Sequence, residues 1–263
     1  MYKYKIAATF ILISMLIESC SHSSESLNKN EHAKKDVPVN FKAYYDFKET
    51  KLKSRGFIID GKESGEWIFY DTLGTEIEKG NYEKGIQSGK WQYNLPSIES
   101  LVIWKSFSNI LSKYTFSLPS SFKPVPNGIV FTAIDTISKE VFTLQEIDYY
   151  SENDYNNYLM LIDNQIKQEL DLLSKSFLKV ATEYNFYHFN YYHMYNKAHN
   201  FEQDMYLICV PFKNKLIILN LNCTPERKER AKWLIGEIYY HLFDKQGERV
   251  DEPWRIITEI VQE

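Results

Sequence analysis

A repeat of 24 residues constrains the fold of this chain more than any other feature of its sequence. The stretch GKESGEWIFY, which begins at Gly61, is followed by GIQSGKWQYN, which begins at Gly85. Matched pairs recur at this offset without a gap, and they are Gly56/Gly80, Gly61/Gly85, Ser64/Ser88, Gly65/Gly89, Trp67/Trp91 and Phe69/Tyr93. Self-similarity at a fixed period is typical of a supersecondary unit that stacks on its own copy. The repeat therefore predicts a structural unit that occurs twice in succession.

Each copy of the repeat has the pattern of a β-hairpin. Trp67 and Phe69 are two residues apart, so both lie on one face of a strand. We expect the glycines to bound a short polar connection, DGKESG, because glycine adopts the positive φ angles of a tight reversal. A second turn signal, YDTLG, begins at Tyr70. The segment thus predicts a small antiparallel meander of about four or five strands.

The glycine and aromatic pattern resembles MORN-type repeats, and more closely the variant repeats of bacterial YwqK-type proteins, some of which are described as antitoxins. The resemblance covers residues 44–95, and we take 41–98 as the MORN-like repeat region. The residues that carry it are Gly61, Gly65, Trp67, Tyr70, Gly80, Tyr82, Gly85, Gly89, Trp91 and Tyr93.

The polar residues of the repeat do not form a catalytic motif. The stretch GFIIDGKE has the spacing of a phosphate-binding loop, but Glu63 stands where the Mg²⁺ ligand must be a hydroxyl. In the second copy Ile86 replaces the lysine. Ser64 follows the pattern Gly-x-x-Ser-Gly, whereas a nucleophile elbow needs Gly-x-Ser-x-Gly. We therefore interpret these residues as parts of turns.

Beyond a linker expected at 99–112, residues 113–243 have the pattern of an α+β domain. Strand-like runs occupy 114–119, 129–134, 141–147, 177–183 and 186–196, and MYLICVPF and KLIILNLNC form a further pair joined at Lys213-Asn214. A capping box at Ser151 opens a predicted helix of about twenty residues. Thr224-Pro225 opens the last long helix. This order is typical of an α+β layer domain, and residues 244–263 follow as a tail.

The order of these elements resembles the PsbP-like fold of photosystem extrinsic proteins, the Ran-binding Mog protein and many bacterial lipoproteins. The resemblance rests on YTFSLPSSF, VFTLQEIDYY, the helix start SENDYNNYL and the strand LIILNLNC. Relatives often have a tryptophan after the opening strand, where this chain has Phe122. The resemblance implies an antiparallel sheet with helices packed on it, in a protein that binds or scaffolds.

The first 19 residues have the pattern of a lipoprotein signal peptide. Lys3 and Lys5 precede an apolar run, Ile6–Ile17, that is too short to span a bilayer. The box that ends at Cys20 resembles those in which the cysteine is acylated, although Glu18 is unusual there. Residues 20–40 then have the composition of a flexible tether. The alternatives are an ordinary signal peptide or an uncleaved anchor.

Acylation of Cys20, for example with palmitate, would place the protein in the cell envelope. It would then contact the membrane through its N-terminal lipid and face the periplasm or the cell surface. We expect the outer rather than the inner membrane, because a serine follows the cysteine.

The aromatic segment 184–201 is a candidate partner surface. A strand with rings on both faces must cover something on each side. One face is core, and the other is either core beneath a helix or an exposed recognition surface. The residues of that second face are Tyr187, Phe189, Tyr191 and Tyr195. His188 and His193 lie at an odd spacing on opposite faces, so we expect no metal site.

Cys209 and Cys223 are expected to remain free thiols. If Lys213-Asn214 is a two-residue turn, Cys209 lies opposite Ile218, and Cys223 lies about 17 Å farther along the ladder. This separation is too long for a disulfide. The net charge of −4 provides no basic field for nucleic acid. We expect no cofactor, no metal and no catalysis, although catalytic groups can converge from distant positions.

Together these patterns predict a lipid-anchored cell-envelope protein that acts as a binding or assembly module, with a protein partner of unknown identity. Two alternatives stay open. The YwqK resemblance implies an antitoxin or immunity-type protein that binds a cognate toxin. The third hypothesis is a hydrolase whose site forms between the repeat region and the α+β domain.

Overall fold

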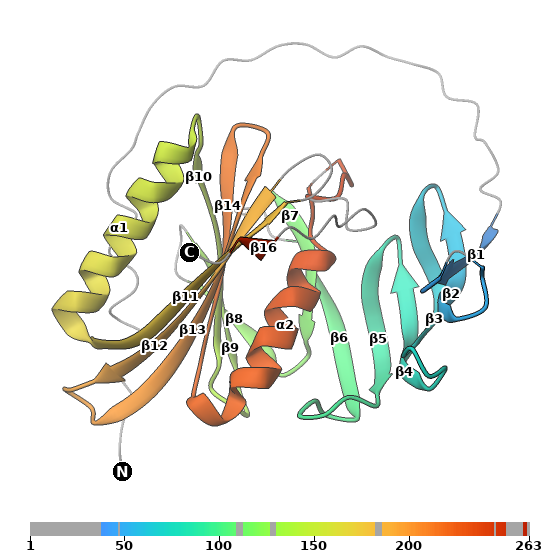
Figure 1. Cartoon of the computed structure of the whole chain (residues 1–263), viewed down its shortest axis with the longest axis horizontal. Coiled ribbons are helices and arrows are strands. Elements are labelled where there is room, and N and C mark those ends of the chain that lie inside the picture. Colours follow the sequence, from blue (N-terminus) through green and yellow to red (C-terminus); the bar gives the residue numbers. More distant parts are fainter. Residues whose placement is uncertain are drawn as a thin grey trace. The chain divides into compact units, whose positions relative to one another are not determined.

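The computed structural model describes residues 38–46, 48–108, 113–126, 130–181, 186–244, 246–250 and 260–261. Cys20 and the predicted signal peptide lie outside them. Within them the chain forms two eight-stranded antiparallel sheets and two α-helices (Figure 1), which confirms the predicted α+β class. Neither helix of this described part is long and apolar enough to cross a bilayer.

The first sheet is an antiparallel meander that runs from blue to green in Figure 1. Its strands are β1 (Val39–Tyr44), β2 (Leu52–Ile59), β3 (Lys62–Tyr70), β4 (Glu76–Glu83), β5 (Ile86–Tyr93), β6 (Leu101–Ser108), β7 (Tyr114–Pro119) and β15 (Phe243–Asp244). From β1 to β7 each strand pairs with the next along the chain, and β15 adds to the edge at β7. The predicted meander is therefore confirmed, and it extends beyond the repeats.

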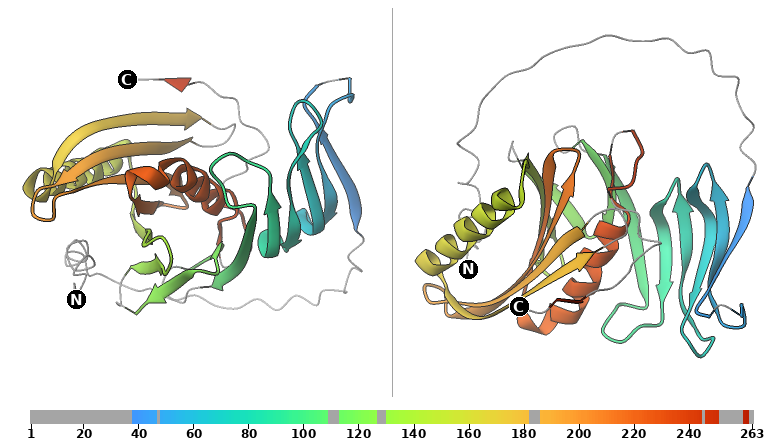
Figure 2. Two further views of the ribbon diagram at one scale, coloured as in Figure 1. Left: turned by 90° about the horizontal axis from the view of Figure 1, so that it is seen from below. Right: turned by 45° about the horizontal axis from the view of Figure 1, so that its top comes forward.

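The second sheet has the strand order β16-β11-β12-β13-β14-β10-β9-β8. Its strands are β8 (Phe122–Val125), β9 (Phe131–Asp135), β10 (Val141–Asp148), β11 (Asp171–Ala181), β12 (Phe186–Asn196), β13 (Phe201–Phe212), β14 (Lys215–Cys223) and β16 (Ile260–Val261). The helices are α1 (Glu152–Glu169) and α2 (Lys228–Tyr240), the latter after the 3-10 turn Pro225–Arg227. The two helices cover opposite faces of this sheet (Figure 2). Accordingly, the buried residues of α1 and those of α2 belong to separate apolar clusters.

The largest apolar cluster joins both sheets. It contains Trp67 and Trp91 of the repeats, Leu234 of α2, and Tyr206 of the second sheet. The predicted linker at 99–112 is wrong for most of its length, because β6 lies there. Its first four residues, LVIW, alternate exposed and buried side chains, as a half-buried strand does. The described residues from 38 onward thus group into one compact unit.

The boundaries of α1 and β11 also differ from the predicted ones. The capping box at Ser151 is present, and the Ser151 backbone N–H donates to Asp154 at 2.9 Å. The helix nevertheless ends at Glu169, and β11 begins at Asp171, six residues before the predicted strand. Leu170 is the last buried residue of the apolar face, and Leu173 is exposed. The apolar face of α1 therefore ends at Leu170 and does not include Leu173.

The hairpin turns of the two repeats are shorter than the sequence suggests. They consist of Asp60-Gly61 and Lys84-Gly85, and all four residues have positive φ angles of 51° to 84°. This is the backbone conformation of a two-residue hairpin turn. Lys62 and the residues after it already belong to β3, so the predicted six-residue connection is wrong. Gly65 and Gly89, at φ 68° and 64°, lie at β-bulges instead.

The bulges let each tryptophan lie flat on a glycine of the preceding strand. A Cβ atom on Gly56 would come within 2.3 Å of the Trp67 ring, and one on Gly80 within 2.1 Å of the Trp91 ring. The Trp67 indole N–H donates to the Phe57 carbonyl at 3.1 Å. The Trp91 N–H repeats this bond to Asn81 at 3.1 Å. The repeat is therefore a repeated packing unit.

Candidate functional site

A groove of about 400 Å³ lies between α2 and the segment that joins β5 to β6. We call it the α2 groove, and its lining residues are Leu95, Pro96, Ile98, Glu229, Lys232, Trp233, Gly236 and Glu237. The residues from the joining segment form an apolar wall. Those from α2 recur at intervals of three and four, so they present one face of the helix. The groove therefore lies where the repeat sheet meets the helix.

Gly236 leaves the backbone of α2 open to the groove. A Cβ atom on Gly236 would meet no atom within 4 Å among the described residues. Internal packing therefore does not explain this glycine. It is also unfavourable for the helix, because glycine inside a helix costs about 1 kcal/mol relative to alanine. Trp233, one turn earlier, packs edge-on against Tyr93 with ring centroids 4.9 Å apart. Its indole N–H is buried without a hydrogen-bond partner in the described part of the chain.

Glu237 is one of the residues that line the groove, and its side chain is 20% exposed. Its Oε2 accepts a hydrogen bond of 2.7 Å from the side chain of Gln87 on β5. Burial raises the pKa of Glu237 to about 7, although the bond from Gln87 lowers it. Burial, and secondly the charge of Glu237, holds the pKa of Glu78 on β4 well above its usual range.

No basic side chain of the described residues offsets this pair of carboxyl groups. The ion-pair contact of Glu237 found there is with His241, whose Nε2 lies 3.9 Å from Oε2. Burial, and secondly the charge of Arg249, holds the pKa of His241 well below its usual value, so the ring is neutral. Its Nε2 also bonds the Tyr82 hydroxyl at 3.1 Å. Two neighbouring carboxyl groups without a cation can exchange protons or bind a cation.

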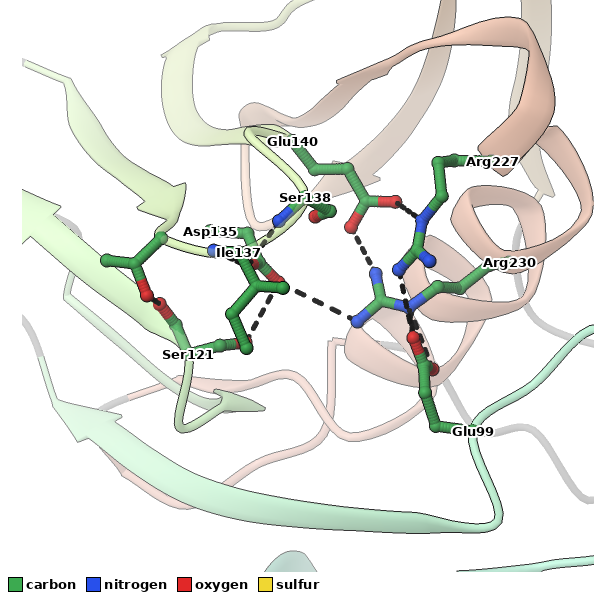
Figure 3. Close-up of polar contacts among 9 residues, drawn as sticks. Glu99, Ser121, Asp135, Ile137, Ser138, Glu140, Arg227 and Arg230 are labelled. Carbon is green, nitrogen blue, oxygen red and sulfur yellow. Dashed lines mark hydrogen bonds and ion pairs between the residues drawn. The ribbon is translucent and has the colours of Figure 1, made fainter.

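A second polar cluster surrounds Arg230 near the start of α2 (Figure 3). Arg230 Nε donates to both Glu99 oxygens, at 2.8 and 2.9 Å, and Nη1 donates to Glu140. Arg227 Nη2 bonds Glu99 at 2.9 Å. Arg230 Nη2 lies 3.7 Å from Asp135, at the end of β9. The cluster thus ties α2 to the β9–β10 hairpin and to the β5–β6 segment.

The groups of this cluster satisfy one another. Burial acts to raise the pKa of Asp135, but hydrogen bonds from the Ser138 and Ile137 backbone and the Ser121 hydroxyl hold it below its usual value. The pKa of Glu99 is also lowered, because hydrogen bonds from Arg230 outweigh its burial. Since each charge is paired, we interpret the cluster as a structural clasp. A cavity of about 210 Å³ lies beside it.

The predicted partner surface on β12 lies partly in the core. Phe189 and Tyr191 are half-buried and pack against Tyr206, with ring centroids 5.7 and 5.1 Å away. Tyr195 bonds Asn200 through its hydroxyl. The side chain of Tyr187 lies outside the described residues. Whether these side chains bind a partner stays a prediction.

The histidines of β12 are on opposite faces, as predicted. The His188 ring stacks on the Tyr155 ring of α1, with ring centroids 3.6 Å apart. His193 Nδ1 lies 2.7 Å from Asp204, and its Nε2 lies 3.5 Å from Glu202. Both nitrogens of His193 therefore face carboxylates. Among the described residues, no group of three or more His, Cys, Asp or Glu is placed to hold a metal ion.

The register of β13 and β14 agrees with the prediction for the cysteines. Cys209 lies opposite Ile218 and Cys223 opposite Asp204. Both thiols are free and buried, which confirms the prediction. Burial raises the pKa of each thiol, and the negative charges of Asp204 and Glu140 add to this effect at Cys223. Neither is a reactive thiolate.

Sequence reasoning missed the groove because its key contact joins residues 150 positions apart, Gln87 and Glu237. One local signal was present. The helix sequence WLIGEIYY places Gly236 inside a periodic apolar pattern, where glycine costs about 1 kcal/mol relative to alanine.

The described part of the chain is thus an α+β protein built on antiparallel sheets. No protein-family profile and no curated protein matches its sequence. Its structure is similar to the solution structure of cyanobacterial PsbP (CyanoP) from Synechocystis sp. PCC 6803, with a TM-score of 0.43 and 16% identity. That similarity covers 54% of this chain and 92% of the cyanobacterial one. A crystal structure of a Pseudomonas aeruginosa protein of unknown function gives a TM-score of 0.31 and 8% identity, over 51% and 91% of the two chains.

Proposed function

We propose that this protein is a lipid-anchored binding module of the cell envelope and that the α2 groove is its ligand site. The observation that carries the proposal is the bare helix backbone at Gly236, which faces open space beside an apolar wall and the half-buried carboxyl group of Glu237. Concave sites with apolar walls and a few polar groups are where proteins usually bind ligands. The predicted PsbP-like and MORN-like character of the chain is consistent with binding or assembly.

Anchoring depends on Cys20. We expect the wild-type chain to incorporate radioactive palmitate in cells and to fractionate with membranes, because an acylated N-terminal cysteine inserts its chains into the bilayer. Cys20→Ser should lose both properties. Cys209→Ser, at a buried thiol, is the matched control and should keep them. Labelling that persists in Cys20→Ser would refute the lipoprotein proposal. Separation of outer from inner membranes would then test the expected location.

Binding at the groove can be tested with a photo-crosslinking amino acid at two exposed positions. Lys232 lines the groove, whereas Leu73 lies in the β3–β4 turn and is 89% exposed. We expect a defined envelope component to crosslink from position 232 and not from position 73. Identical adducts at both positions, or none at 232, would contradict the proposal. A single stoichiometric toxin at 232 would instead favour the antitoxin alternative.

The hydrolase alternative has one observation in its favour. Glu237 has a pKa of about 7 and lies where the repeat sheet meets α2, as a general acid or base between the two parts would. The groove lining contains no serine, threonine or cysteine. The proposal of binding stands instead on the open backbone at Gly236 and the apolar wall.

A further inference from the structure

We propose, building on the proposed function, that the α2 groove binds a protonated primary amine on an aliphatic chain, such as a lysine side chain of the partner. Three features of the groove suit this ligand: an apolar wall, an indole ring beside bare helix backbone, and a carboxyl group in the lining.

The walls fit the carbon chain of such a ligand. Leu95, Pro96 and Ile98 offer apolar contact on one side. On the other side, Gly236 lets an aliphatic chain approach the helix backbone, because no Cβ fills the space. Long amines bury their methylene stems along apolar surface and keep the charge at the tip. Trp233 lies beside this path, and indole is the ring that attracts cations most strongly.

The carboxyl group of Glu237 in the groove lining fits the charge. Glu237 is largely buried, and in the part of the chain that the structure describes it has no lysine or arginine partner. The groups that surround it are Glu78 and Tyr82 from β4, Gln87 and Tyr93 from β5, Glu229, Lys232 and Tyr240 from α2, and His241 after it. Lys232 is exposed at the rim, and the carboxyl groups outnumber it. An anionic ligand would meet Glu229 and Glu237, and an uncharged one would leave the carboxyl pair without a cation.

The ligand should therefore bind more tightly as the pH rises. The amine stays protonated from pH 5 to pH 9, because its usual pKa is about 10.4. Burial raises the pKa of Glu237 to about 7, so its carboxyl group is mostly protonated below that pH. A cation binds the ionised carboxylate. We expect the affinity to fall up to about tenfold for each pH unit below 7 and to level off above 8.

Isothermal titration calorimetry of the full-length chain in detergent micelles tests this proposal. The probe is the peptide acetyl-Gly-Lys-Gly-amide, and the control is the same peptide with an acetylated lysine side chain. At pH 8 we expect a dissociation constant on the order of 1 mM for the amine peptide and at least tenfold weaker binding of the acetylated one. Equal binding of the two peptides, or no binding of the amine peptide, would overturn the proposal.

Variants separate the groove from the rest of the molecule. Gly236→Ala fills the space beside the helix, and Glu237→Gln removes the charge at nearly constant shape. Each should weaken amine binding at least tenfold, whereas Glu226→Gln, outside the groove, should not change it. Thermal melting checks folding, and Gly236→Ala should raise the Tm by about 2 to 4 °C because alanine favours the helix. Full binding by both groove variants would also overturn the proposal.

The ligand class and the binding role of the groove can be refuted separately. If the amine peptide does not bind but position 232 still crosslinks to a defined component, the choice of ligand class is wrong and the groove remains a binding site. If crosslinking at position 232 also fails, the proposed function is wrong.

Discussion

Replacement of Gly80 by alanine should reduce the free energy of unfolding by about 3 kcal/mol. The new Cβ would lie 2.1 Å from the Trp91 ring, which is fully buried. The ring cannot yield freely, because Trp91 packs against Tyr82 and its N–H bonds the Asn81 carbonyl. Overpacking of a rigid core usually costs 1–3 kcal/mol, and about 1 kcal/mol more is expected from the strained or lost indole hydrogen bond. Urea denaturation followed by tryptophan fluorescence measures the loss.

Two other glycines of the chain are matched controls. Gly74 has a positive φ of 84° but open space around it, so Gly74→Ala should cost only about 1 kcal/mol of backbone strain. Gly236→Ala should stabilise the protein, since the helix gains a better former. A Gly80→Ala variant that unfolds at the same urea concentration as Gly74→Ala would show that the Trp91 ring moves at little cost.

The repeat was predictable because its signals are local. Trp67 and Trp91, with glycines at one offset, predict hairpins from sequence alone. The function of Gly65 in a bulge was not predictable, because a positive φ suits both a turn and a bulge. Likewise the register of β13 and β14 followed from a two-residue turn at Lys213-Asn214, where both residues have positive φ.

The joining of the two sheets was not predictable from the same signals. β6 was hidden because Leu101 and Ile103, on its exposed face, are apolar and mask the alternation with Val102 and Trp104. Once β6 pairs with both β5 and β7, the repeats continue into the α+β region and share its core. The groove and the clasp both lie at this junction. Their side chains come from segments more than 80 residues apart in sequence, so no local pattern reports them.

Replacement of Arg230 by methionine should reduce the free energy of unfolding by about 3 to 5 kcal/mol at pH 7. The variant keeps the apolar stem but removes the guanidinium group that pairs with Glu99, Glu140 and Asp135. Glu140 is 0% exposed and Asp135 1%, so their charges would remain buried with little compensation. Loss of one partner from a buried ion pair typically costs this much.

The clasp also makes this loss depend on pH. Asp135 and Glu99 have pKa values below their usual range in the folded protein. Such carboxyl groups contribute stability above the pKa of the unfolded chain, about 4, and lose it as the pH falls through the folded pKa. Without Arg230 that contribution is smaller. The difference between wild type and Arg230→Met should therefore be largest at pH 7 and shrink towards pH 3.

Arg227→Met is the matched control for the clasp. Arg227 contacts the same two glutamates, but its side chain is 34% exposed and water can replace much of its interaction. We expect a loss below about 1 kcal/mol, as for other exposed ion pairs. Urea denaturation of both variants at pH 7 and pH 4 gives the comparison. If the two arginine variants lose equal stability, the buried position of Arg230 is not what makes the clasp strong. A loss for Arg230→Met that does not change with pH would show that Asp135 and Glu99 do not depend on it.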